Sequence, residues 1–397
     1  MDFNLSEEDR AIQETVRRFG DEVLRPRTKE IDEKATIPMD ILEEMGRLGL
    51  LAMPASDAYG GMGATAVQTE LVSEEIGRGD ISMATAVFFL LEAGWGYLLS
   101  RHGTEEAKKE ILPPVCQGKH FLGVSSTEPG GGSDLAGMKT TSKRDGKDFI
   151  INGEKAFISG VTEAKERGGG HLTITKSLDR DGFSIIFVPT QAKGVEVIRT
   201  KNMGRMGIST GSLVYDNVRV PEKYLVGKEC KGFGLAMEGF SVARTFVAAA
   251  CVGAAERALE EGMNYIKARN VFGSPLGKFE GIQFELADQY AQVEAVKWQC
   301  RKAAWLVDQK IFSGPGGHHS DVDLAVASVK LMAPQVAFDT YKKVMMWFGA
   351  SGYTKEIGLE MGFRGVMSYL VGAEGGLNIM RIIMGRELLG KEFVPYK

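Results

Sequence analysis

The stretch that decides the fold reads Phe149-Ile150-Ile151-Asn152-Gly153-Glu154-Lys155-Ala156-Phe157-Ile158, inside a chain otherwise patterned for helices. Its β-branched and aromatic residues are typical of strands, and Asn-Gly is a strong hairpin signal. The sequence therefore predicts two antiparallel strands joined at Asn152-Gly153. Further short strands are predicted nearby, at residues 172–175, 183–188, 194–198 and 213–220, with turns at Asp145-Gly146 and Asp181-Gly182.

Apolar residues recur at helical spacing on both sides of this β segment. Ile12, Val16, Phe19 and Val23 fall on one face of a first helix. The same pattern predicts helices at residues 41–48, 67–76, 81–99, 254–268 and 284–312. The order along the chain is therefore helical, then β, then helical again.

The composition excludes several classes of protein. The chain has 397 residues, of which 44% are apolar and 25% charged, as in ordinary globular proteins. A net charge of -4 argues against a nucleic-acid partner, and no basic block suggests an anionic membrane. No apolar run is expected to reach transmembrane length. The 4 cysteines lack metal-ligand spacing and no secretory signal precedes them, so we expect free thiols and a cytoplasmic location.

A glycine-rich loop lies where the helical pattern gives way to strands. It reads Thr127-Glu128-Pro129-Gly130-Gly131-Gly132-Ser133-Asp134. Consecutive glycines expose backbone N–H groups in a concave loop, which suits a pyrophosphate. A tight interdomain turn is the alternative. Two other motifs are not interpreted as binding sites. Gly61–Ala66 lacks the preceding strand of a dinucleotide fingerprint. His318-His319 is interpreted as a solvated turn without a metal.

Near the C-terminus, Gly372-Ala373-Glu374-Gly375-Gly376-Leu377-Asn378 places one carboxylate among small residues, before a helix at residues 379–386. A carboxylate on such a turn is poorly solvated, which raises its pKa toward that of a working base. The flanking glycines let a flat ligand approach the backbone. The alternative is an acid that merely complements the helix dipole.

Three well-spaced motifs, in order over essentially the whole chain, resemble the acyl-CoA dehydrogenase family. Thr127–Asp134 is similar to the signature T-E-P-G-x-G-S-D. Arg269–Gln283, followed by Leu286-Ala287-Asp288, resembles R-x-x-F-G-x-P-L-x-x-F-Q-x-x-Q…L-A-D. Glu374-Gly375 resembles the catalytic turn, and Arg386-Glu387-Leu388 the A-R-E-L that follows it.

The resemblance implies an α+β, mostly α fold with three domains: an N-terminal helical domain (1–120), a central β-barrel (121–230) and a C-terminal four-helix bundle (231–397). It also implies a homotetramer built from two dimers.

The resemblance further implies FAD as cofactor. The residues expected to contact it in the same subunit are Val124, Ser126, Thr127, Gly132, Ser133, Phe157, Ile158, Ser159, Gly375 and Asn378. Phe157 would pack beside the isoalloxazine ring and the Ser159 hydroxyl would bond near N5. Arg269, Phe272, Met346 and Gly349 would face the FAD of the neighbouring subunit, where arginine suits a diphosphate.

The implied reaction is dehydrogenation of an acyl-CoA thioester between Cα and Cβ. Glu374 would remove the α-proton, while its backbone N–H would polarise the thioester carbonyl. Ser133, Ser241, Arg244, Gly375 and Glu92 would lie against the substrate. Electrons would pass to an electron-transfer flavoprotein. On the same scaffold, an acyl-CoA oxidase, a non-redox lyase and a catalytically silent FAD/CoA-binding subunit are the alternatives.

The chain departs from the family pattern at several positions. Ala243 stands where some members carry the base and cannot act as one, which favours Glu374 as the base. One extra residue separates Arg364 from Glu374; if it were absorbed elsewhere, Ala373 would take the catalytic position. The downstream Arg381 and Arg386 align without gaps, so Glu374 is preferred. Met346 and Glu280 replace glutamines, and Ser241 replaces an aspartate that often holds the CoA adenine.

Glu92 is a lone acid in an apolar helical run, Phe88–Trp95. An unpaired buried charge is costly, so Glu92 is either the partner of a buried basic residue or a substrate-facing group. We predict for test that Glu92 faces the acyl pocket, which would suit an alicyclic, branched or polar acyl group.

Overall fold

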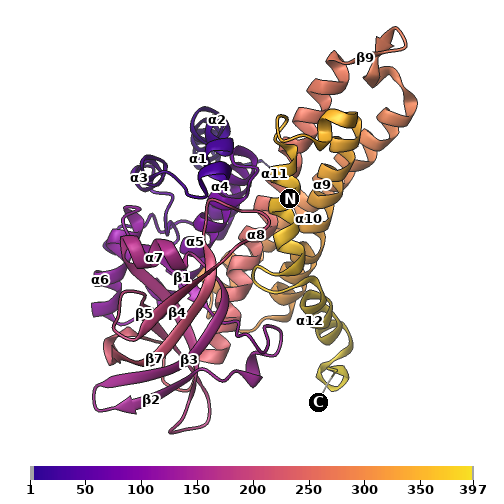
Figure 1. The fold of residues 1–397 in the computed structure, drawn as a ribbon. Helices are drawn as coiled ribbons and strands as arrows, with labels where there is room; N and C mark the ends of the chain where they lie inside the picture. The colour runs from indigo at the N-terminus through magenta and orange to yellow at the C-terminus, as the bar shows by residue number, and fades with distance from the viewer. Residues whose placement is uncertain (1–3, 396–397) are drawn as a thin grey trace.

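The computed structural model describes residues 4–395. Its N-terminal part is helical (Figure 1), with α1 (Glu7–Phe19), α2 (Arg25–Lys34), α3 (Met39–Arg47), α4 (Ala66–Gly79), α5 (Ala84–His102) and α6 (Glu105–Cys116). Ser6 caps α1 by accepting a hydrogen bond from the Asp9 amide, as the acidic start of the sequence indicates. Both α4 and α5 are buried on nearly every side, so they form the centre of this part.

The middle of the chain forms one eight-stranded sheet. Its strands are β1 (Phe121–Ser125), β2 (Thr141–Asp145), β3 (Asp148–Ser159), β4 (Gly169–Ser177), β5 (Phe183–Pro189), β6 (Val195–Thr200), β7 (Thr210–Pro221) and β8 (Leu225–Val226), with α7 (Val161–Arg167) after β3. The pairing order is β6-β7-β3-β2-β4-β5-β8, and β1 also pairs with β4. The central domain is thus a sheet whose path of pairing runs between two edge strands, β6 and β8.

The predicted hairpin at Asn152-Gly153 is wrong. β3 runs straight through this pair and keeps pairing with β7 on both sides of it, with a register shift between Ile151 and Gly153. Gly153 has a φ of 139°, so the glycine permits a bulge and not a turn. The true turn joins β2 to β3 and uses Gly146, at a φ of 63°. The other predicted strands are confirmed.

The C-terminal part is again helical. It contains α8 (Gly232–Ala268), α9 (Glu280–Val307), α10 (Ser320–Trp347), α11 (Leu359–Val371) and α12 (Leu377–Leu389). The chain projects as an arm between α8 and α9, where a small hairpin, β9 (Asn270–Val271) and β10 (Ser274–Pro275), lies far from the sheet (Figure 1). The predicted domain boundaries fall in connections, between α6 and β1 and between β8 and α8; as boundaries they stay a prediction.

The expectation that no apolar run reaches membrane-spanning length needs correction. Within the described residues, α8 is long and apolar enough by length and composition. However, 89% of its apolar window is buried inside the protein. It packs against α4, α5 and α10, as the core helix of a folded domain does.

Candidate functional site

A cavity of about 790 Å³ opens between the sheet and the surrounding helices. Val87, Leu90 and Leu91 of α5 supply an apolar wall. The glycine-rich loop, the end of β3, the β6–β7 loop, α8 and the segment from α11 to α12 complete it. Segments that are far apart in the sequence therefore share one cavity of the size that small ligands need.

Most of the predicted site residues lie in the wall of this cavity. They are Val124, Ser126, Thr127, Gly132, Ser133, Phe157, Ile158, Ser159, Arg244, Glu374 and Gly375. Phe157 lies near the end of β3 with a φ of 57° and an exposure of 69%, both unusual for a large aromatic residue. A ring held out in this way offers its face to a flat ligand in the cavity.

Glu374 sits on a strained turn between α11 and α12. Ala373, Glu374 and Gly375 have φ values of 49°, 61° and 109°, three left-handed residues in a row. Such conformations persist in non-glycine residues only when the surroundings hold them, and they concentrate at functional sites. Arg244 provides one such hold, because its Nε donates to the Glu374 carbonyl oxygen at 2.8 Å.

The environment of Glu374 shifts the pKa of its carboxyl upward. Burial raises the pKa of its carboxyl to about 7, while Arg244, Trp95 and Lys330 each pull the pKa down. The Trp95 indole nitrogen is buried without a well-aligned hydrogen bond, yet its N–H still favours the carboxylate. Desolvation is therefore the dominant effect, as the small residues around Glu374 predict.

Lys330 of α10 is a second hold on the turn, and sequence reasoning missed it. Its fully buried ammonium donates to the carbonyl oxygens of Tyr369 at 2.7 Å, Gly372 at 3.5 Å and Gly375 at 3.2 Å. Burial lowers the pKa of Lys330 to about 8. The signal in the sequence was a single lysine within an apolar stretch of helix.

The glycine-rich loop is held by the opposite arrangement. The Glu128 carboxylate accepts from the amides of Lys139 at 2.6 Å and Thr140 at 2.9 Å, and pairs with Lys155 Nζ at 3.0 Å. Burial raises the pKa of Glu128, but these donors outweigh burial and lower it to about 2. Gly130 and Gly131 lie on the exposed side of the loop, whereas Gly132 and Ser133 line the cavity.

Two predicted residues near the cavity contact other side chains and do not line it. Ser241 is buried, and its hydroxyl donates to Asp323 Oδ1 at 3.4 Å. The Asn378 Oδ1 accepts from Arg381 at 2.7 Å on the exposed surface of α12. Ser241 lies about one helical turn before Arg244, and only Arg244 lines the cavity.

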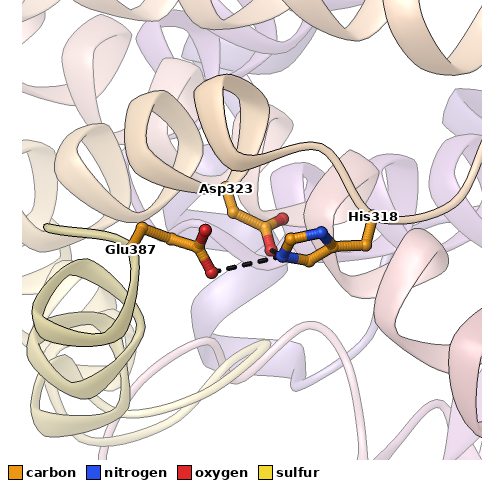
Figure 2. Close-up of side chains that lie close together, drawn as sticks. All are labelled: His318, Asp323 and Glu387. Carbon is orange, nitrogen blue, oxygen red and sulfur yellow. Dashed lines mark hydrogen bonds and ion pairs between the residues drawn. The ribbon is translucent and has the colours of Figure 1, made fainter. Parts of the chain in front are cut away.

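His318 belongs to a small charged cluster (Figure 2). Its Nε2 lies 3.4 Å from Asp323 Oδ2 and 3.2 Å from Glu387 Oε1. The three ligand atoms lie within 4.8 Å of one another. Arg386 also pairs with both acids, at 3.1 Å and 2.6 Å, so the two carboxylates already have a cationic partner in the structure. The His318 side chain is 50% exposed, in keeping with the predicted turn.

The structure contradicts the expectation that Glu92 faces the substrate. The cavity side of α5 carries Val87, Leu90 and Leu91, whereas Glu92 is fully buried on the side that meets β1 and α6, beside Leu122 and Cys116. Both of its carboxylate oxygens lack a hydrogen-bond partner among the described residues. Burial raises the pKa of Glu92 well above its ordinary value, which favours the neutral acid. Because α5 is apolar all round, its sequence could not show which face meets the cavity.

The residues expected to face a neighbouring subunit lie away from this cavity. Phe272, at the tip of the arm, is 97% exposed, and Arg269 at the end of α8 is also exposed. Met346 is 73% exposed and Gly349 lies beside it on the surface. None of these four residues lines the cavity described above.

The comparison with known families agrees with this geometry. The acyl-CoA dehydrogenase N-terminal, middle and C-terminal domains match residues 6–119, 123–218 and 230–389 in turn. The chain belongs to the acyl-CoA dehydrogenase family. A probable acyl-CoA dehydrogenase of Bacillus subtilis is 32% identical over 395 residues, covering 98% of this chain and 100% of the relative.

Two other acyl-CoA dehydrogenases show the range of the family. A cyclohex-1-ene-1-carbonyl-CoA dehydrogenase of Syntrophus aciditrophicus is 32% identical over 392 residues, covering 97% of this chain and 91% of the relative. The crystal structure of a glutaryl-CoA dehydrogenase from Mycobacterium smegmatis with FADH2 has a TM-score of 0.89 at 27% identity, covering 99% and 97% of the two chains.

Acyl-CoA dehydrogenases are FAD-dependent oxidoreductases that act on CH–CH groups, and FAD is the cofactor here. The cavity suits it, because Gly132 and Ser133 of the glycine-rich loop and the projecting Phe157 ring lie in its wall.

Proposed function

We propose that this chain dehydrogenates an acyl-CoA thioester to the enoyl-CoA, with Glu374 as the base that removes the α-proton. The observation that carries this proposal is a carboxylate in the cavity wall whose pKa is raised to about 7 by burial. A base works best when its pKa lies near the operating pH. FAD, when bound, accepts the hydride that leaves Cβ.

The turn of Glu374 also supplies a hydrogen-bond donor. Among residues 4–395, the backbone N–H of Glu374 has no acceptor, while the carbonyls around it are taken up by Arg244 and Lys330. A preorganised N–H stabilises the negative charge that develops on the thioester oxygen when the α-proton leaves. One residue thus contributes the base through its side chain and the oxyanion donor through its backbone.

The acyl group stays open between several classes. The predicted preference for an alicyclic, branched or polar acyl group was based on Glu92, which lies outside the cavity. Similarity to a cyclohex-1-ene-1-carbonyl-CoA dehydrogenase supports an alicyclic acyl group at the level of a relative.

The direct test is anaerobic mixing of the FAD-loaded protein with linear, branched and alicyclic acyl-CoAs, read by bleaching of the flavin. We expect at least one to bleach it and little peroxide to form in air. Rapid peroxide formation would instead identify an oxidase. A protein that binds FAD and CoA thioesters but never bleaches would identify a silent binding subunit and refute the proposal.

We further propose that the complete FAD site needs a second subunit, within a homotetramer. Large side chains of the arm, α9 and the end of α10 are exposed, among them Phe272 (97%), Phe284 (64%), Trp305 (53%) and Tyr353 (93%). Such a set marks an interface more often than a free surface. Arg269→Ala should weaken FAD retention by about 10- to 100-fold, from a lost charge-assisted contact. Full FAD occupancy in this variant would contradict the cross-subunit site.

Electron-transfer flavoprotein is the acceptor that the family resemblance suggests, and the cytoplasmic location expected from the scattered cysteines stays a prediction. Reoxidation of the bleached protein by a purified electron-transfer flavoprotein, with no reoxidation by a flavodoxin as control, would support this partner.

A further inference from the structure

The β6–β7 loop carries a cation into the cavity wall. Arg205 lines the cavity together with its neighbours Asn202, Met203 and Gly204. Its backbone has a φ of 56°, an uncommon conformation for a long side chain. This strained backbone places the arginine in the cavity wall. Because strained residues concentrate at functional sites, the position of Arg205 suggests that it binds a ligand.

Arg205 differs from the other arginines of the cavity because it has no partner. Arg244 is bonded to the Glu374 carbonyl, and Arg364 is paired with Asp32 at 2.8 Å. Within residues 4–395, the Arg205 guanidinium has neither an ion pair nor a hydrogen bond, and its Nε is buried. The side chain as a whole is half-buried and carries a charge with no partner in this chain, so its guanidinium can take up an anion from the cavity.

The neighbours of Arg205 place it on the acyl side of the cavity. Its strongest electrostatic neighbour is Tyr369, whose fully buried hydroxyl also lacks a partner, and Tyr369 is in turn influenced by Glu374. The same loop packs Gly207 against Ala84, the first residue of α5, where an added Cβ would approach within 2.9 Å. The apolar wall of α5 therefore leads toward two polar groups without partners.

We infer that Arg205, with the Tyr369 hydroxyl beside it, binds a carboxylate at the far end of the acyl group, so that the preferred substrates are CoA thioesters of dicarboxylic acids. This inference rests on the proposed function. A guanidinium binds a carboxylate through two parallel N–H donors, and a phenol can add a third. An apolar acyl end would leave both groups without a partner, which gives the site its selectivity.

The test compares two acyl groups of similar shape, glutaryl-CoA and 5-methylhexanoyl-CoA, which differ in a terminal carboxylate or isopropyl group. Binding is measured by calorimetry in the Glu374→Gln background, so that no turnover is needed. We expect glutaryl-CoA to bind about 10- to 100-fold more tightly. Arg205→Met should remove or invert this preference, and Arg205→Lys should restore part of it.

Lys201→Met is the matched control, since Lys201 is an exposed cation of the same loop outside the cavity. It should leave the preference unchanged. FAD content is measured for every variant, because a loss of FAD in Arg205→Met with equal binding of both thioesters would assign Arg205 to the cofactor and overturn the inference. Wild-type protein that binds both thioesters equally would overturn it too, whereas the proposed function fails only if no acyl-CoA bleaches the flavin.

Discussion

Glu128, which is buried, and Glu374, which is half-buried in the cavity wall, sit on two glycine-rich segments of this protein, and their surroundings shift their pKa values in opposite directions. Glu128 is surrounded by donors and its pKa is lowered to about 2, so it stays ionised and holds the loop in place. Glu374 meets few donors and burial raises its pKa to about 7. The number of donors around a buried carboxylate thus separates an acid that holds structure from one that can exchange a proton.

The two segments are also held by charges of opposite sign. Near the glycine-rich loop, the carboxylate of Glu128 accepts hydrogen bonds from backbone N–H groups. At the Glu374 turn, the ammonium of Lys330 donates hydrogen bonds to backbone carbonyls. Holding the carbonyls leaves the Glu374 amide available to a ligand.

The largest expected effect is on the chemistry of Glu374. Glu374→Gln should slow anaerobic flavin reduction by at least about 10²–10⁴-fold, because an amide cannot accept the α-proton. FAD content and acyl-CoA binding should stay near wild type. Flavin reduction at the wild-type rate would show that the base lies elsewhere and that Glu374 does not differ from Glu128 in exchanging a proton.

The next effect is on stability at Glu128. Lys155→Met leaves a buried carboxylate without its ion-pair partner, which should lower the free energy of unfolding by about 3–5 kcal/mol. Urea unfolding at pH 7 measures this change. An ion pair of the surface, Arg219 with Asp148, offers the control, since Arg219→Met should change stability by less than about 1 kcal/mol.

The two glutamates predict opposite pH dependences of stability. The folded pKa of Glu128 lies below its ordinary 4.5, so its contribution is complete above about pH 4.5 and is lost as pH falls toward 2. The folded pKa of Glu374 lies above 4.5, so the protein loses stability as pH rises from about 5 through 7. Thermal unfolding should therefore show Glu374→Gln gaining on wild type between pH 5 and 8, by about 1–3 kcal/mol. A constant difference over this range would contradict the raised pKa.

A smaller effect is expected from the lysine behind the turn. Lys330 lowers the pKa of Glu374, so Lys330→Met should raise that pKa and move the acid limb of the flavin-reduction rate to higher pH. At pH 7 the rate should fall about tenfold, since less of the base is ionised. Lys297→Met is the matched control, because Lys297 is also largely buried but bonds to Glu74 and Glu256 in the helical bundle. If both variants keep the wild-type pH profile, Lys330 is only a structural residue.

The smallest effect is expected at Glu92. Burial favours the neutral form of this acid, and its carboxylate oxygens have no hydrogen-bond partner among the described residues, so Glu92→Gln should exchange two side chains of similar shape and charge. Stability should change by less than about 0.5 kcal/mol. The ranking of acyl-CoA substrates should also stay the same. A changed ranking with normal stability would restore the substrate-facing reading that the structure contradicts.

Local patterns in the sequence were enough for much of this description. Helical spacing predicted the terminal helices, and β-branched runs predicted most strands. The poorly solvated carboxylate at Glu374 followed from the small residues around it. The Asn152-Gly153 hairpin failed because a glycine at positive φ suits a bulge as well as a turn, and only pairing with β7 selects between them.

By itself, then, the sequence determined the order of the helical and β parts, the glycine-rich loop, the Glu374 turn and the family resemblance, because these depend on neighbours along the chain. The tertiary structure alone decided which face of α5 meets the cavity, which removed Glu92 from it. It also brought Lys330 under the turn and Arg205 into the wall, 44 and more than 150 residues away from Glu374. Burial and charge pairing arise between segments distant in the chain, so no local pattern contains them.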